Sequence, residues 1–166
     1  MRVLVTAASK HGATLEIASA IADKIREANM DVDCLAPDSV REVDAYDAVV
    51  IGSAVYAGHW MSPARAFVDR HAAQLSQRPV WLFSSGPVGD PPKPDEELVE
   101  IEPMVRRLGA RGHRTFSGRL DPDALGFVER ALTAALRAPH GDFRDFNDIR
   151  TWAAGIVEAM RPTVHA

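Results

Sequence analysis

Residues 3–14 read VLVTAASKHGAT, and the fold of this chain can be worked out from them. Residues 3–6 are apolar or β-branched and predict a short buried strand, while the apolar repeat that begins at Leu15 predicts a helix. Residues 7–13 must then form the turn that joins the two. The first N–H groups of a helix have no partner within it, and the positive end of the helix dipole attracts anions. The stretch therefore predicts a place for a phosphate-like anion, although an ordinary capped turn has the same pattern.

The side chains of this turn also suit a phosphate group. Ser9 and Thr14 carry hydroxyl groups that can donate hydrogen bonds, and Lys10 adds a positive charge; His11 is either a phosphate contact or a surface residue. Gly12 is the one glycine of the turn, so the turn has neither the GxGxxG of dinucleotide-binding folds nor the GxxxxGK[ST] of nucleoside triphosphatases. A mononucleotide fits this pattern better than a dinucleotide or a triphosphate.

Composition limits the classes of protein that this chain can belong to. Its 166 residues, of which 46% are hydrophobic and 25% charged, predict one soluble globular domain over residues 1–166. The net charge of −4 argues against a nucleic-acid-binding protein, which normally has a basic face. We find neither a secretory signal nor a continuous apolar run long enough to span a bilayer, so we expect a cytoplasmic protein with at most peripheral membrane contact.

Cys34 is the only cysteine of the chain. A single cysteine excludes a disulfide framework, a cysteine-based metal site and a CxxC redox pair. We expect no metal site. Any redox chemistry of this protein must therefore come from a bound cofactor.

Strands and helices alternate along almost the whole chain. Alternating or continuous apolar runs predict strands at residues 31–36, 47–52, 79–85 and 113–119. Apolar stripes at helical spacing predict helices from Leu15 to Ile25, from Ser62 to Leu75, and at residues 95–108, 121–136 and 146–160. Ser62 is expected to cap its helix, with Pro63 at the first helical position, and Pro103 to kink the helix at 95–108. This alternation predicts a parallel sheet with helices on both faces.

Five such strands have a natural arrangement in the flavodoxin-like order 2-1-3-4-5. We therefore predict a doubly wound α/β three-layer sandwich, with an extra helical segment near residues 121–141. In that order the loops after the first, third and fourth strands meet at the carboxyl ends of the strands, where ligands of open α/β sheets bind. These loops are residues 7–13, 53–61 and 86–94.

The second and third of these loops differ in character. The second, SAVYAGHWM, concentrates Tyr56, His59 and Trp60 on an expected exposed turn, which suggests stacking on a flat ring beside the phosphate site. Its aromatic residues could instead cap the sheet, and His59 is either a hydrogen-bond donor, a proton shuttle or a packed structural residue. The third loop offers backbone amides at Gly86, Val88 and Gly89 but no aromatic side chain.

Two further sequence patterns have more than one interpretation. The acidic run of Glu96, Glu97, Glu100 and Glu102 is typical of a solvated helix face, and less often of a docking patch for a redox partner. The apolar stripe within residues 125–136 predicts core or homodimer contact, and the arginines that flank it leave a membrane or quinone surface as the alternative.

Two segments resemble a known family. The turn SKHGAT before LEIASAIADKI, together with VVIGSAVYAGHWMSPARAFVDRHAAQL, resembles the menaquinone-dependent protoporphyrinogen oxidases of the flavodoxin-like family. The likeness is clear over residues 1 to about 120 and looser beyond them. Lys10, His11 and Ala13 depart from the hydroxyl-rich turn of simple flavodoxins.

The resemblance implies FMN as the cofactor. It assigns the phosphate to the first loop, that is, to Ser9, Lys10, His11, Gly12, Ala13 and Thr14. It assigns the isoalloxazine ring to the other two loops, that is, to Ser53, Ala54, Val55, Tyr56, Gly58, His59 and Trp60, and to Ser85, Gly86, Pro87, Val88 and Gly89. His59 is the candidate catalytic residue.

The resemblance also implies an FMN-dependent oxidoreductase that acts on a porphyrinogen or passes electrons to a quinone. Two alternatives remain at this point. One is a flavodoxin-type carrier, which exchanges electrons with redox partner proteins and has no small-molecule substrate. The other is a flavin-free binding module that kept the fold, because fold alone does not establish function.

Overall fold

The computed structural model describes residues 1–9, 12–56, 58–86, 100–116, 119–120, 141–142 and 145–161. Within these ranges, the side chains of Tyr56 and of residues 119–120 and 141–142 are not described. The elements in chain order are β1 (Arg2–Ala8), α1 (Ala13–Arg26), β2 (Asp31–Leu35), the 3-10 helix η1 (Pro37–Ser39), β3 (Ala48–Tyr56), β4 (His59–Trp60), α2 (Ser62–Leu75), β5 (Val80–Ser85), α3 (Ile101–Leu108), β6 (Gly112–Phe116), β7 (Arg119–Leu120), β8 (Gly141–Asp142) and α5 (Phe146–Met160).

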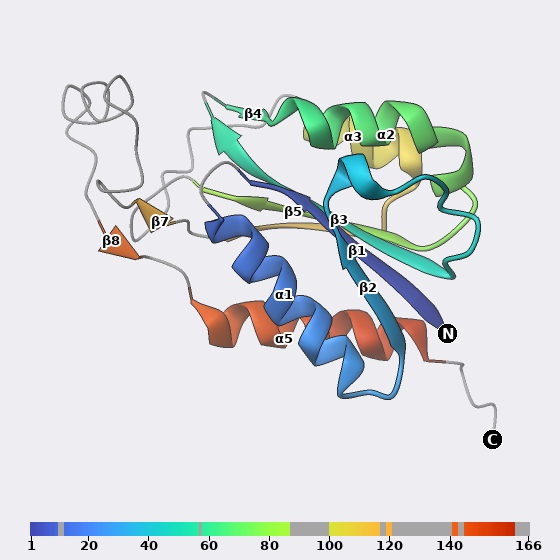
Figure 1. Cartoon of the computed structure of the whole chain (residues 1–166), viewed down its shortest axis with the longest axis horizontal. Helices are drawn as coiled ribbons and strands as arrows, with labels where there is room; N and C mark the ends of the chain where they lie inside the picture. Colours follow the sequence, from blue (N-terminus) through green and yellow to red (C-terminus); the bar gives the residue numbers. More distant parts are fainter. Residues whose placement is uncertain are drawn as a thin grey trace.

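Five parallel strands form the central sheet in the order β2-β1-β3-β5-β6 (Figure 1). Counted without the short strand β4, this order is 2-1-3-4-5, which confirms the predicted flavodoxin-like topology. β4 pairs antiparallel with the end of β3. The strands β7 and β8 form a separate antiparallel pair; the helix expected between them, at residues 121–136, lies outside the described residues.

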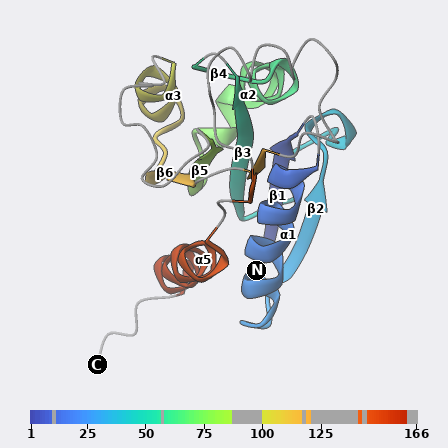
Figure 2. The ribbon, with the colours of Figure 1, turned by 90° about the vertical axis from the view of Figure 1, so that its left-hand side faces the viewer.

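Helices cover both faces of the sheet. α1 and α5 pack on one face, and α2 and α3 on the other, so the molecule has three layers (Figures 1 and 2). Each face has its own apolar core, because apolar side chains of β1, β3 and β5 point to both sides in alternation. The continuous apolar runs of the sequence are thus explained by strands that are buried on both faces of the sheet.

A tight contact between β3 and β5 lies near the carboxyl end of the sheet. Gly52 and Phe83 are direct neighbours in the parallel pairing of these strands. A Cβ atom at Gly52 would lie only 2.1 Å from Cζ of Phe83, whose ring is fully buried. The phenylalanine ring therefore occupies the space that a side chain at position 52 would need.

Three local predictions about helices are wrong. Leu15 is 43% exposed, because the buried stripe of α1 passes through Ile17 instead. Ser62 is the first residue of α2 and not its cap: the N-cap is Met61, and no side chain caps this helix. Pro103 is the third residue of α3, where an N–H group has no partner within the helix, so the proline does not interrupt the helical hydrogen bonds.

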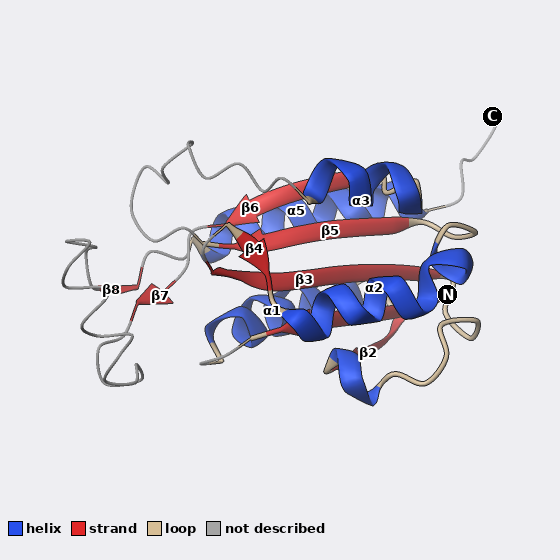
Figure 3. Ribbon diagram, turned by 90° about the horizontal axis from the view of Figure 1, so that it is seen from above, coloured by secondary structure: helices blue, strands red, loops and turns tan. Residues whose placement is uncertain are grey.

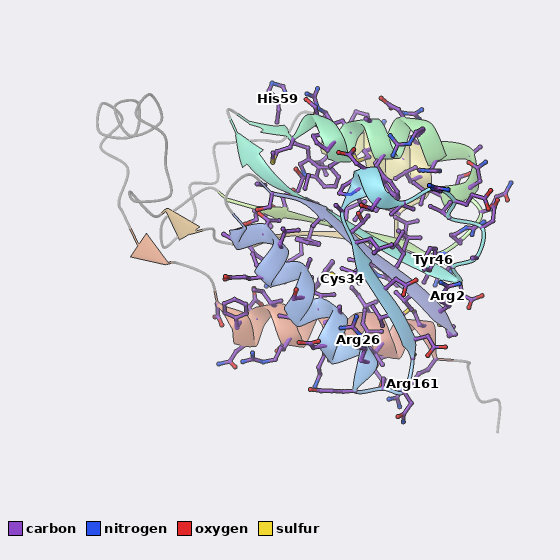
Figure 4. All side chains as sticks on the ribbon, in the orientation of Figure 1. Arg2, Arg26, Cys34, Tyr46, His59 and Arg161 are labelled. Carbon is purple, nitrogen blue, oxygen red and sulfur yellow. The ribbon has the colours of Figure 1, made fainter. Side chains whose placement is uncertain are left out.

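A polar cluster of Arg2 on β1, Asp33 on β2 and Tyr46 just before β3 lies at the amino end of the sheet. Nη2 of Arg2 and the hydroxyl of Tyr46 both donate to Oδ2 of Asp33, at 2.9 and 2.7 Å. These two bonds, the one from Tyr46 first, lower the pKa of the Asp33 carboxyl below its ordinary value. Figure 4 shows Arg2 and Tyr46 together at the end of the sheet opposite to the hairpin that carries His59.

Of the helices that the structure describes, none is both long and apolar enough to cross a membrane.

Candidate functional site

The carboxyl ends of β1, β3 and β5 lie side by side (Figures 1 and 3). The strand register pairs Ala8 with Ser53 and Ala54 with Ser85, so the chain leaves the three strands at neighbouring points. The three predicted segments therefore start from one edge of the sheet, as parallel topology requires.

The first of these segments is the turn between β1 and α1. The backbone N–H of Gly12 donates to Oγ of Ser9 at 3.0 Å, which closes the turn, and the N–H of Glu16 donates to the carbonyl of Gly12 as the helix begins. Gly12 has a left-handed conformation with φ of +85°, and a Cβ at this position would meet no described atom within 4 Å beyond its chain neighbours and its own helix. Glycine adopts this conformation at low cost, whereas a residue with a side chain would be strained there.

The remaining residues of the turn are only partly described. Thr14 is 2% exposed. Because it lies in the first turn of α1, its backbone N–H has no carbonyl partner within the helix. Ala13 is the first helical residue, and Lys10 and His11 lie outside the described residues. Ser9 uses its oxygen as an acceptor for Gly12, which leaves its hydroxyl hydrogen free to donate.

The second segment is a hairpin and not the loop that the sequence predicted. β3 continues to Tyr56, and β4 runs back beside it, with Val55 opposite Trp60 and Tyr56 opposite His59. The two-residue turn between the strands contains Gly58 at a φ of +78°, a conformation that suits glycine. The side chain of Tyr56 is not among the described residues, so its predicted role in stacking stays a prediction.

The expectation that Trp60 is exposed is wrong. Its side chain is 1% exposed and packs in the core on the α2 side of the sheet. Its Nε1 donates to Oγ of Ser84 at 2.8 Å. The buried indole therefore offers no free face for stacking on a cofactor ring. Trp60 instead follows the alternative that an aromatic residue of this segment closes over the sheet.

Ser84 links Trp60 to a histidine that the sequence did not single out. Its Oγ lies 2.8 Å from Nε2 of His113 on β6. An indole N–H can only donate, so Oγ of Ser84 accepts from Trp60 and its own hydrogen is free to donate to Nε2 of a neutral imidazole. Burial lowers the pKa of His113, which also favours the neutral form. These three side chains form one hydrogen-bonded chain, in which Trp60 and Ser84 are buried and His113 is partly buried.

His59 lies at the tip of the hairpin, and its side chain is 61% exposed. Figure 4 shows it pointing away from the sheet. Nδ1 of His59 lies 3.7 Å from Oε2 of Glu100, whose other oxygen accepts the backbone N–H of Trp60 at 2.5 Å. The carboxylate of Glu100 therefore faces two successive hairpin residues.

The glutamates of the acidic run at the start of α3 thus differ in exposure. Glu100 has a side chain only 22% exposed, whereas that of Glu102 is 73% exposed and is paired with Arg106 one turn along the helix. The interpretation as a solvated helix face fits Glu102 and is wrong for Glu100. Glu96 and Glu97 lie outside the described residues.

Ser53, predicted as a ring contact, is committed to the protein itself. It is fully buried, its hydroxyl donates to the carbonyl of Ala54 at 2.8 Å, and its oxygen accepts the N–H of Met61 at 2.9 Å. Ser53 therefore holds the end of the hairpin at the start of α2. Ala54 and Val55 are partly exposed at the same edge of the sheet.

The third segment begins at Ser85, which is 6% exposed. Gly86 follows with φ of +107°, and its N–H donates to the carbonyl of Phe116 at 2.8 Å. This donor already joins β5 to β6, and the amide contact from Gly86 to a ring stays a prediction. Pro87, Val88 and Gly89 lie outside the described residues.

These observations test how well the residues fit FMN. The turn closed by Ser9 and Gly12 fits a phosphate, because it brings a hydroxyl group together with the N-terminal amides of α1. On the ring side, His59 is exposed beside the hairpin while Trp60 is not. The described part of the site thus fits the phosphate end of a mononucleotide more completely than its ring.

Comparison with known proteins agrees with this geometry. The family described as "Flavodoxin domain" matches residues 4–147. A protein of Escherichia coli K12 named protoporphyrinogen IX dehydrogenase [quinone] is 32% identical over 134 residues, which are 80% of this chain and 70% of that protein.

Two solved structures show the same fold. A flavodoxin from the domain Archaea superposes with a TM-score of 0.66 at 20% identity, covering 96% of this chain and 98% of its own. Flavodoxin 1 from Bacillus cereus has a TM-score of 0.67 at 16% identity, covering 97% and 100%. At these identities the likeness establishes the fold alone.

Proposed function

The chain belongs to the flavodoxin domain family, and from this membership we propose that it binds FMN at the carboxyl ends of β1, β3 and β5 and acts as an oxidoreductase. The observation that carries the proposal is the turn before α1, where Ser9 accepts the N–H of Gly12 and its hydroxyl lies beside the N-terminus of the helix. We further propose a porphyrinogen as the electron donor and a quinone as the acceptor, as the name of the E. coli relative suggests.

FMN, when bound, supplies the redox chemistry, and the protein binds, orients and tunes it. In our proposal the hydroxyl groups of Ser9 and Thr14 donate to the phosphate, and the backbone N–H of Thr14 adds a further donor at the positive end of the helix dipole. His59 is exposed at the hairpin tip, where its imidazole can donate a hydrogen bond or move a proton at the ring edge. No side chain acts as a nucleophile.

The first experiment is to purify the protein and record its visible spectrum. A yellow protein that releases FMN on acid treatment, or a colourless one that takes up FMN in a titration, is the expected result. A protein that neither contains nor takes up FMN would refute the proposal and leave the flavin-free binding module.

The phosphate assignment predicts the effect of removing both hydroxyl groups of the turn. The double variant Ser9→Ala, Thr14→Ala is expected to weaken FMN binding more than tenfold, about 1.4 kcal/mol. Isothermal titration measures this, with riboflavin as the control ligand. Because riboflavin has no phosphate, its affinity should change much less, and an unchanged FMN affinity would contradict the assignment.

The substrate proposal needs a separate assay. We expect anaerobic oxidation of protoporphyrinogen IX by the FMN-loaded protein when a menaquinone analogue is present, and none when the quinone is omitted. If FMN binds but neither compound turns over, while reduced FMN exchanges electrons with a redox protein, the protein is a carrier and not this enzyme.

A further inference from the structure

We propose that Glu100 is a positioning residue of the cofactor site, because its carboxylate fixes the β3–β4 hairpin through the backbone of Trp60. This inference rests on the proposed binding of FMN. It assigns a role to a residue that lies 40 positions after Trp60 in the chain and directly before α3.

The need for such a residue follows from the hairpin itself. Tyr56 and His59 face each other across the two-residue turn, so the next residue, Trp60, directs its N–H away from β3. A buried backbone N–H without a partner is costly, and β4 has no other strand beside it among the described residues. Glu100 supplies the missing acceptor at 2.5 Å.

The bond from Glu100 differs from the other two polar bonds that hold this segment. Ser84 accepts from the Trp60 indole and Ser53 from the Met61 N–H, and both serines lie on strands of the central sheet. Glu100 instead precedes α3, so its bond ties the hairpin to the helical layer on that face of the sheet. A hydrogen bond between a carboxylate and an N–H is also stronger than one between neutral groups.

The second oxygen of Glu100 acts on the neighbouring residue. It lies 3.7 Å from Nδ1 of His59, which is longer than a hydrogen bond but within the range of an ion pair when the imidazole is protonated. The carboxylate thus holds the backbone of one hairpin residue and faces the side chain of the next. Together these contacts set where the hairpin tip lies beside the proposed ring site.

The test compares Glu100→Ala, which removes the acceptor, with Glu100→Gln, which keeps an oxygen that can accept the Trp60 N–H. Glu102→Ala is the matched control, because Glu102 lies two residues away and is exposed and paired with Arg106. Thermal unfolding first establishes that each variant is folded. We then measure FMN affinity by fluorescence titration and, on flavin-free protein, the hydrogen exchange of the Trp60 amide by NMR.

We expect Glu100→Ala to speed exchange of the Trp60 amide and to weaken FMN binding, each by about tenfold, as loss of a charge-assisted bond predicts. Glu100→Gln, which keeps an acceptor but loses the charge, should lie between wild type and Glu100→Ala in both measurements, and Glu102→Ala should change neither.

Three results would overturn the inference. Equal FMN affinities of Glu100→Ala and Glu102→Ala would show that the hairpin bond does not position the site. Glu100→Gln as weak as Glu100→Ala would show that the charge matters and the hydrogen bond does not. Wild-type protein that takes up no FMN would refute the proposed function together with the role of Glu100. The first two results would refute the role of Glu100 alone.

Discussion

Polar clusters occupy both ends of the central sheet, but they are built differently. At the amino end, Arg2, Asp33 and Tyr46 form a cluster in which the charged side chains are 50% and 39% exposed. At the carboxyl end, Trp60 is 1% exposed and donates to a fully buried serine, Ser84. The first cluster keeps its charges near water, whereas the Trp60–Ser84 pair of the second holds two neutral partners inside the core.

This difference follows from the cost of burying polar groups. A charge that stays near water can pair with little penalty and contributes little, whereas buried neutral groups must all be satisfied. The amino-end cluster joins the neighbouring strands β1 and β2. The carboxyl-end network joins β3, β4, β5 and β6 and the start of α3, so a change there reaches more of the fold and the proposed site together.

The largest expected effect comes from Trp60→Ala. Removing a fully buried aromatic side chain typically lowers the free energy of unfolding by about 3–5 kcal/mol. Denaturant unfolding measures this loss. The matched variant Trp60→Phe keeps an aromatic ring but loses the N–H that bonds to Ser84 and part of the ring volume, so its loss should be smaller, about 1–2 kcal/mol. Losses of the same size for both variants would contradict the assignment of this residue to the core.

A smaller effect is expected from His113→Gln, and it depends on pH. Because burial lowers the pKa of His113, the folded protein binds fewer protons at this group than the unfolded chain does. Stability from this group is present above its ordinary value of 6.5 and is lost as pH falls through that value toward the folded pKa. We therefore expect a shallower decrease of stability with acid in His113→Gln than in wild type.

This pH test compares the two ends of the sheet directly. Burial also lowers the pKa of His71, so part of the slope should remain in His113→Gln. Asp33→Asn should leave the slope near pH 6 unchanged, because the pKa of Asp33 is lowered from 3.8. Identical slopes in wild type and His113→Gln would contradict the buried state of His113.

The smallest expected effect is that of Asp33→Asn. Its ion pair is exposed and screened by water, so the melting temperature near pH 7 should fall by less than about 4 °C. The contribution of Asp33 is present above pH 3.8 and is lost as pH falls through the folded pKa, so wild type and variant should converge in strong acid. FMN affinity should not change. A change in affinity would show that the two ends are coupled.

The fold was predictable because each strand and helix has a strong local pattern. Apolar runs such as that at the end of β3 specify strands buried on both faces, and right-handed connections leave few possible strand orders. Element ends were less predictable, since they depend on tertiary contacts. The Ser-Pro pair at residues 62–63 resembles a cap in sequence, yet the helix begins one residue earlier than a cap at Ser62 requires.

The site was predictable as a location but not in its details. The turn around Gly12 follows from local sequence, because glycine and hydroxyl residues between a strand and a helix are typical of a tight turn at a helix N-terminus. The hairpin was predicted as a loop, so its pairing, which turns Trp60 into the core, was missed. Glu100 and His113 act through partners far away in the chain, and no local pattern signals such contacts. Ser84 gave the one usable signal, a hydroxyl in an otherwise apolar strand.

The close approach of Phe83 to Gly52 has a consequence for related sequences. Because the ring fills the space of a side chain at position 52, the two positions share one volume. We expect them to vary together among homologues: where position 52 carries alanine or a larger residue, position 83 should carry a residue smaller than phenylalanine. A double variant with a larger residue at position 52 and a smaller one at position 83 should then fold, whereas a larger residue at position 52 alone should not be tolerated.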